Sequence, residues 1–78
     1  MPRGLFNWIA EDVVRFLKAH DFALNHVRGS HYFYTGHYGG VLRQVCVPFH
    51  GSLSIKPKTL KGIILQSGIP KDQWLSGG

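Results

Sequence analysis

The sequence is short of cysteine, of acidic residues and of long apolar runs, and each shortage narrows what the chain can be. Its single cysteine, Cys46, cannot form an internal disulfide, which fits a reducing cytosol. No apolar run approaches the ~20 residues of a membrane-spanning helix, and the first residues lack the pattern of a signal peptide. We therefore expect a cytoplasmic protein.

The same shortages argue against metal and nucleophile chemistry. The histidines and Cys46 are possible zinc ligands, but the chain has no C-x-x-C or H-x-x-x-H pair. Four Asp and Glu residues in the whole chain leave few partners to orient a nucleophilic serine or cysteine. We expect neither a metal nor another cofactor.

Basic residues predominate, with nine Lys and Arg and a formal charge of +5. This charge favours a polyanion or an acidic protein as partner. The alternative is that its only role is to keep the protein soluble. The 78 residues form one domain, 1–78, with its core over about residues 8–75. A domain of this size buries only about 60% of its unfolded surface, which leaves little room for a deep cofactor pocket.

The first half opens with the pattern of an amphipathic helix. Asn7 is a candidate N-cap, Glu11 and Arg15 are spaced to pair, and an arm over residues 1–7 is expected to pack through Leu5 and Phe6. The apolar stripe of this helix comprises Ile9, Val13, Phe16, Leu17 and His20. We expect the helix to end near His20 or Asp21.

Three strands are predicted next, at residues 22–28, 31–35 and 42–47. Gly29 and Ser30 form the first connection, and Gly36, Gly39 and Gly40 mark the second. Alternation places Phe22, Leu24 and His26 on one face, and likewise His31, Phe33 and Thr35, with Tyr32 and Tyr34 opposite.

A second helix is predicted to begin at Pro57 and to end at Gly68, which Ile69 follows as a hydrophobic contact. Its buried face comprises Leu60, Ile63 and Ile64. Gly62 weakens this helix, so we expect another element to come close there. Residues 70–75 form a last short turn that packs Trp74 onto the domain.

The predicted order is helix, strand, strand, strand, helix. Short connections make the strands an antiparallel meander, and each helix has one apolar stripe, so both helices should cover the same sheet face. The fold class is α+β, with the plan of a double-stranded-RNA-binding domain.

Of the five histidines, His31 and His50 have the settings most suited to chemistry, because each lies at a strand boundary beside a Gly or Pro that fixes the backbone. An imidazole there is a usable acid or base at neutral pH. The alternative is that they merely close a hydrogen bond. We expect His20 to be structural, His26 to be packing or surface, and His37 to be solvated.

Basic side chains surround the start of the second helix at Lys56, Lys58 and Lys61, where free amides already favour a phosphate. A plain solvated helix end is the alternative. Arg28 and Arg43 either extend this patch or pair with Asp21 and Asp72. Tyr32, Tyr34 and Tyr38 either stack bases or pack in the sheet.

Four stretches follow one another along the chain: residues 12–17 with Phe22, the Arg28-Gly29-Ser30-His31 turn, residues 45–50 ending in Pro48-Phe49-His50, and residues 56–64 with Ser67-Gly68-Ile69. In their order and spacing they resemble the HicA family of toxins from prokaryotic toxin–antitoxin modules. The chain departs from the family pattern at Asp21, where the family usually has glycine.

The resemblance implies an mRNA interferase, an endoribonuclease that blocks translation, with His31 as its catalytic residue. It also implies the double-stranded-RNA-binding type of fold and a HicB-type antitoxin that covers His31 and the basic surface. RNA cleavage without a metal needs a base for the 2′-hydroxyl and a cation for the phosphate, for which Lys56 and Lys58 are candidates.

His50 and water are both candidates for the acid of this reaction, and Ser30 is a further auxiliary residue. A non-catalytic RNA-binding module of the same fold is the alternative, and a protein that only docks an acidic partner is a third reading.

Overall fold

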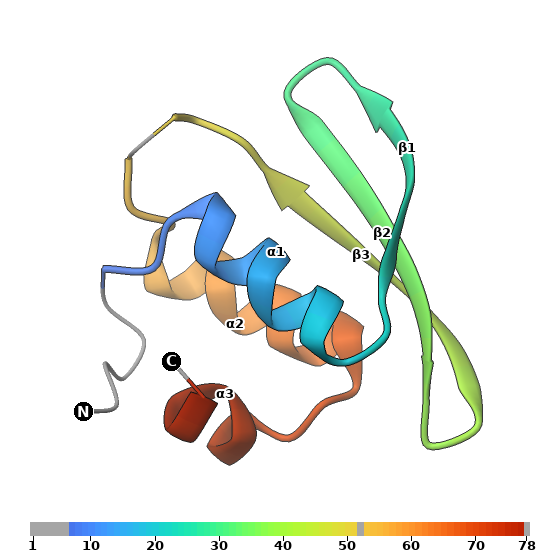
Figure 1. The fold of residues 1–78 in the computed structure, drawn as a ribbon. Helices are drawn as coiled ribbons and strands as arrows, with labels where there is room; N and C mark the ends of the chain where they lie inside the picture. Colours follow the sequence, from blue (N-terminus) through green and yellow to red (C-terminus); the bar gives the residue numbers. More distant parts are fainter. Residues whose placement is uncertain (1–6, 52, 78) are drawn as a thin grey trace.

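The computed structural model describes residues 7–51 and 53–77, and its order confirms the predicted α-β-β-β-α plan (Figure 1). A third helix follows where only a turn was predicted. The elements are α1 (Ala10–Ala19), β1 (Ala23–Arg28), β2 (His31–Tyr38), β3 (Val41–Pro48), α2 (Pro57–Ser67) and α3 (Lys71–Gly77). The expected packing of Leu5 and Phe6 lies outside the described residues. No helix among those described is long and apolar enough to cross a membrane.

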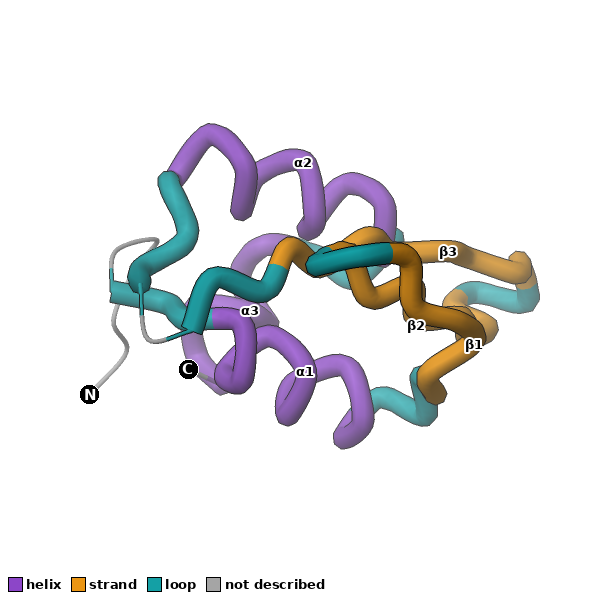
Figure 2. The backbone as a smooth tube through the Cα atoms, turned by 90° about the horizontal axis from the view of Figure 1, so that it is seen from above, coloured by secondary structure: helices purple, strands orange, loops and turns teal. Residues whose placement is uncertain are grey.

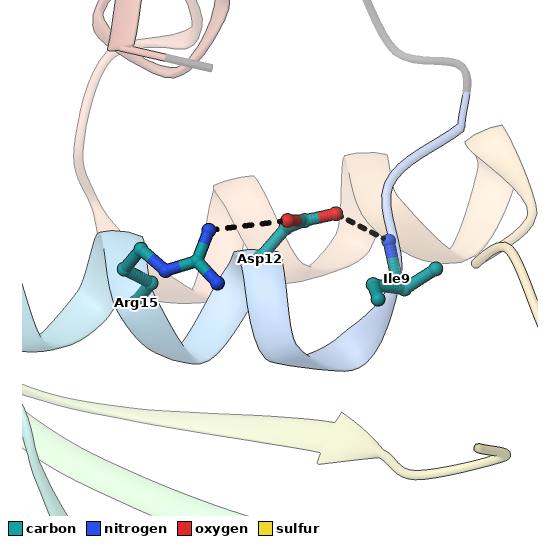
Figure 3. A network of polar contacts seen from close by, with 3 residues as sticks. All are labelled: Ile9, Asp12 and Arg15. Atoms are coloured by element: carbon teal, nitrogen blue, oxygen red, sulfur yellow. Dashed lines mark hydrogen bonds and ion pairs between the residues drawn. The ribbon is translucent and has the colours of Figure 1, made fainter. Parts of the chain in front are cut away.

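Helix α1 begins two residues later than Asn7 would cap it, so the predicted N-cap is wrong. Ile9 is the N-cap residue, and the Asp12 carboxylate accepts a hydrogen bond from the Ile9 amide at 3.0 Å (Figure 3). The same carboxylate lies 3.5 Å from the Arg15 guanidinium, so Arg15 pairs with Asp12 rather than with Glu11. An acidic residue in the first turn accepts a hydrogen bond from an otherwise free amide, and its negative charge is stabilised by the positive end of the helix dipole.

The sheet has the order β1-β2-β3 with antiparallel pairing throughout. A bulge between Leu24 and His26 places Leu24 opposite Tyr34 but His26 opposite Phe33. The prediction that Leu24 and His26 share a face is therefore wrong, because one extra residue in a strand reverses the alternation. The His26 ring stacks on Phe33 at 4.4 Å, on the face that also carries His31.

Glycine positions correct two further predictions. Gly36 lies inside β2, not in a loop, and the Phe22 side chain occupies the space that a Cβ there would need. Strand β2 continues to Tyr38, and the turn falls at Gly39 and Gly40, both with positive φ. No other element of the described chain approaches Gly62, since an added Cβ would meet nothing outside its own helix turn within 4 Å.

One face of the sheet is buried against the helices through Tyr34, Val45 and Val47. Helix α2 runs beside β3 (Figure 2), where the Gln66 side-chain oxygen accepts from the Cys46 amide at 3.1 Å at the open strand edge. Both long helices contact β3, whereas every residue of β1 is exposed. Packing is therefore concentrated at the β3 side of the sheet.

An aromatic cluster packs between α1 and α3. The Phe16 ring stacks on Trp74 at 3.9 Å, and Trp8 lies 5.7 Å from Trp74. The predicted packing of Trp74 onto the domain is confirmed, and Trp8 is a core residue that the sequence pattern did not single out. His20 stacks on Phe16 at 4.3 Å with its Nδ1 3.0 Å from the Phe16 carbonyl oxygen, which fits the structural role expected of it.

Candidate active site

His31 opens β2 at the end of the sheet, with Arg28 opposite it in β1 and Pro48 opposite it in β3. Gly29, two residues before His31, has a φ of 61, a left-handed conformation that glycine adopts without strain. The His31 side chain is exposed. The turn thus presents an accessible imidazole on a strand whose backbone is paired on both sides.

A shallow pocket of about 240 Å³ lies beside this imidazole, between the sheet and α2. Its lining comprises His31, Cys46, Pro48, Thr59, Gly62, Ile63 and Gln66. Burial raises the pKa of the Cys46 thiol, so this sulfur is less prone to ionise than a free cysteine. The pocket combines an imidazole and a hydroxyl with an apolar floor.

A second pocket of about 230 Å³ surrounds His50 and Lys56. Its other lining residues are Pro48, Leu53, Ser54, Ile55 and Thr59. Pro48 and Thr59 also line the His31 pocket, so the two pockets adjoin. The amide of Phe49 donates to the Ser30 carbonyl at 2.8 Å, which ties the chain entering the His50 loop to the turn before His31.

Two of the predicted lysines, Lys56 and Lys61, line different pockets. Lys56 lies in the His50 pocket, and Lys58 is exposed in the first turn of α2. Lys61 lines a different pocket, of about 220 Å³, with Ile64, Leu65 and Lys71.

The two arginines are placed at opposite ends of the sheet. Arg28 lies opposite His31, whereas Arg43 pairs with Gly36, five residues along β2 and so about 16 Å away at ~3.3 Å per residue. The Arg43 guanidinium packs against Gly68 at the end of α2, and its Nε is buried with no hydrogen-bond partner among the described residues. Arg28 is therefore near His31, and Arg43 is not.

The tyrosines face the helices, which confirms the packing interpretation of this strand. Tyr34 is buried, and its pKa is raised by that burial and by neighbouring Tyr32. Tyr32 and Tyr38 are half-buried against the core. The opposite face carries the stacked His26–Phe33 pair, which sequence reasoning missed because the bulge was not foreseen.

Thr59 and Gln66 are further polar residues at the site that the sequence did not single out. Both lie on α2 and line the His31 pocket. Their signal was the helical spacing from Gly62, which places 59, 62 and 66 on one face of a helix. Across residues 7–51 and 53–77, no three His, Cys, Asp or Glu side chains are grouped to hold a metal ion.

Comparison with known protein families gives a match over most of the chain. A family model described as the HicA toxin of bacterial toxin–antitoxin modules matches residues 10–69, from α1 to the residue after Gly68. This span contains His31, both adjoining pockets and all the predicted basic residues, but not α3. No curated protein and no solved structure matches the chain.

Proposed function

Because the chain belongs to the HicA toxin family of bacterial toxin–antitoxin modules, we propose that it is an mRNA-cleaving endoribonuclease with His31 as its catalytic residue. The observation that carries the proposal is the setting of His31, an exposed imidazole at a pocket that adjoins a second imidazole and a lysine. The expected double-stranded-RNA-binding architecture, the turn that presents His31 and the net charge of +5 support it.

The reaction assigns a proton transfer to His31. Its imidazole accepts the proton of a ribose 2′-hydroxyl, and the 2′-oxygen attacks the adjacent phosphorus. The bond from phosphorus to the 5′-oxygen breaks, leaving a 2′,3′-cyclic phosphate and, once that oxygen takes up a proton, a 5′-hydroxyl end. Arg28, opposite His31, and Lys56 supply positive charge toward the phosphate.

His50 and water are the candidates for the acid that protonates the 5′-oxygen. His50 lines the adjoining pocket, on the other side of Pro48 and Thr59 from His31. Ser30 acts through its backbone, whose carbonyl accepts from Phe49 and fixes the start of the His50 loop. None of these steps is assigned to a metal ion, so cleavage is expected to persist in EDTA.

The partner is a HicB-type antitoxin in the cytoplasm that covers His31 and the basic side chains near it. Family membership supports a partner of this kind, because HicA toxins belong to two-component modules. A cationic surface of this size also favours an acidic partner through long-range attraction.

The test is to induce the wild-type chain, His31→Ala and His37→Ala in cells while growth and mRNA integrity are followed. His37 is an exposed histidine of the same strand and controls for loss of an imidazole. The wild type and His37→Ala should arrest growth and cut mRNA, and His31→Ala should do neither. An active His31→Ala variant contradicts the assignment, and a folded but inactive wild type indicates an RNA-binding module without catalysis.

A further inference from the structure

Each of the two pockets at the end of the sheet combines an imidazole with apolar surface. The His31 pocket joins an imidazole to apolar surface from Cys46 and Ile63. The His50 pocket joins an imidazole and the Lys56 ammonium to apolar surface from Leu53. A nucleotide is also amphiphilic, with a flat base of low polarity attached to a charged phosphate, so both pockets suit the same class of ligand.

The size of each pocket limits what it can hold. The volumes are about 240 and 230 Å³. Both fall below the ~300–1,000 Å³ of pockets that take drug-sized ligands. Neither pocket alone therefore holds a dinucleotide, and we assign one nucleoside to each.

The residues between the two pockets lie where the phosphodiester that joins the two nucleosides would pass. Pro48 and Thr59 line both pockets, so a phosphodiester joining the two nucleosides passes over these residues. Pro48 is opposite His31 in the sheet, and His50 is two residues further along the chain. One imidazole then lies on the side of the 2′-hydroxyl and the other on the side of the leaving 5′-oxygen.

We propose that the pocket of His50, Leu53, Lys56 and Thr59 is the subsite for the nucleotide that leaves in the cleavage reaction, with the scissile phosphate above Thr59. The inference rests on the proposed endoribonuclease function and adds a second substrate site to it. Leu53, a leucine 70% exposed to solvent, then has a role as the apolar surface against which the leaving base packs.

This arrangement requires single-stranded RNA. In a duplex the two bases are stacked on one another and paired, so they are not free to enter separate pockets. A strand whose bases are splayed apart fills both. The substrate class is thus a single-stranded stretch of RNA, bound through two consecutive nucleotides.

The test compares leaving groups. Each ribonucleoside 3′-(methyl phosphate) fills only the His31 pocket, whereas each dinucleoside monophosphate fills both. For the wild type, kcat/KM should favour the best dinucleotide over its methyl ester by at least about tenfold, the effect of one charged hydrogen bond. Leu53→Ser and Lys56→Gln should each reduce this preference, mainly through KM.

Lys71→Gln is the matched control, because Lys71 lies in the separate pocket with Lys61 and should leave the preference as in the wild type. A preference that is absent in the wild type, or unchanged in both pocket variants, overturns the subsite while leaving His31-dependent cleavage in place. A lack of His31-dependent cleavage with every substrate overturns the nuclease proposal and the subsite together. Cleavage of a duplex as fast as of its single strand also overturns the subsite.

Discussion

The Phe22 ring lies against Gly36 so closely that a Cβ added to Gly36 would be 2.7 Å from the Phe22 ring. Gly36 is in the middle strand and Phe22 immediately precedes β1, so this contact closes the sheet where the chain leaves α1. Phe22 is buried there at 3% exposure, which explains why a glycine interrupts a strand rich in aromatic residues.

Gly36→Ala should destabilise the fold, because the Phe22 ring and backbone leave no room for a methyl group. Overpacking of a filled core typically costs about 1–3 kcal/mol. Urea unfolding would measure the loss, with His37→Ala as the control at an adjacent, exposed position. Equal midpoints for the two variants would refute the close contact.

Gly62→Ala should have the opposite effect on stability. The residue lies inside α2, and an added Cβ meets no described atom outside its own helix turn within 4 Å, so alanine should gain about 0.5–1 kcal/mol from its higher helix propensity. Gly62 also lines the His31 pocket, and a methyl group there reduces the space for substrate. A higher unfolding midpoint together with slower RNA cleavage is the expected pair of results. Faster cleavage would contradict the placement of substrate in this pocket.

Trp74→Ala should cause the largest loss of stability among these variants. The Trp74 side chain is fully buried and stacks on Phe16, and removal of a large aromatic side chain from a core costs about 3–5 kcal/mol. That is a large part of the 5–15 kcal/mol that stabilises typical domains. Leu75→Ala, at the half-buried neighbour, should lose less in the same urea titration. If Trp74→Ala does not fold, Trp74→Phe keeps the comparison measurable.

Cys46 should react slowly with iodoacetamide at neutral pH. Burial raises its pKa, and the thiolate is the reactive form, so alkylation should lag behind that of a free cysteine at any pH below this raised pKa. In the linkage sense, the folded chain holds this proton more tightly than the unfolded chain, so its contribution to stability is lost as the pH rises through the raised pKa. Once alkylated, the chain should cleave RNA poorly, because Cys46 lines the His31 pocket. Rapid alkylation at pH 7 would contradict the burial.

Lys56→Gln and Lys61→Gln should differ in their effect on RNA affinity. Lys56 shares a pocket with His50, whereas Lys61 shares one with Leu65 and Lys71. In the His31→Ala background, Lys56→Gln should weaken the binding of single-stranded RNA more than Lys61→Gln does. The slope of log Kd against log salt concentration should fall by roughly 0.7, the value for one lost phosphate contact with a single strand. Equal losses of RNA affinity in the two variants would contradict the placement of Lys56 in the RNA site and Lys61 outside it.

Local signals in the sequence were sufficient for the main elements. Pro57 and Gly68 bound α2 as predicted, since one lacks an amide that the first turn does not use and the other adopts the left-handed conformation at φ 75. The strand order followed from two short connections. These features depend on residues close together in the chain, which a sequence displays directly.

Features that depend on distant contacts were not predictable in the same way. The bulge after Leu24 reverses which side chains share a face, and only the pairing with β2 reveals it. Glycine is typical of loops, but the role of Gly36 is set by Phe22, which lies in the connection between α1 and β1. At the candidate site, His31 was identified from its turn, whereas Thr59 had only a helical spacing from Gly62 and is brought to the site by the packing of α2 beside β3.

The contact between Trp8 and Trp74 joins two residues that have nearly the whole chain between them. Ordering such a long intervening segment carries a large loop-closure entropy, so this contact is expected to form late in folding, after the hairpins and α2. Loss of either tryptophan should then raise the unfolding rate more than it lowers the folding rate. The family match ends before α3, so the element that completes this closure belongs to the part of the chain that the family pattern does not specify.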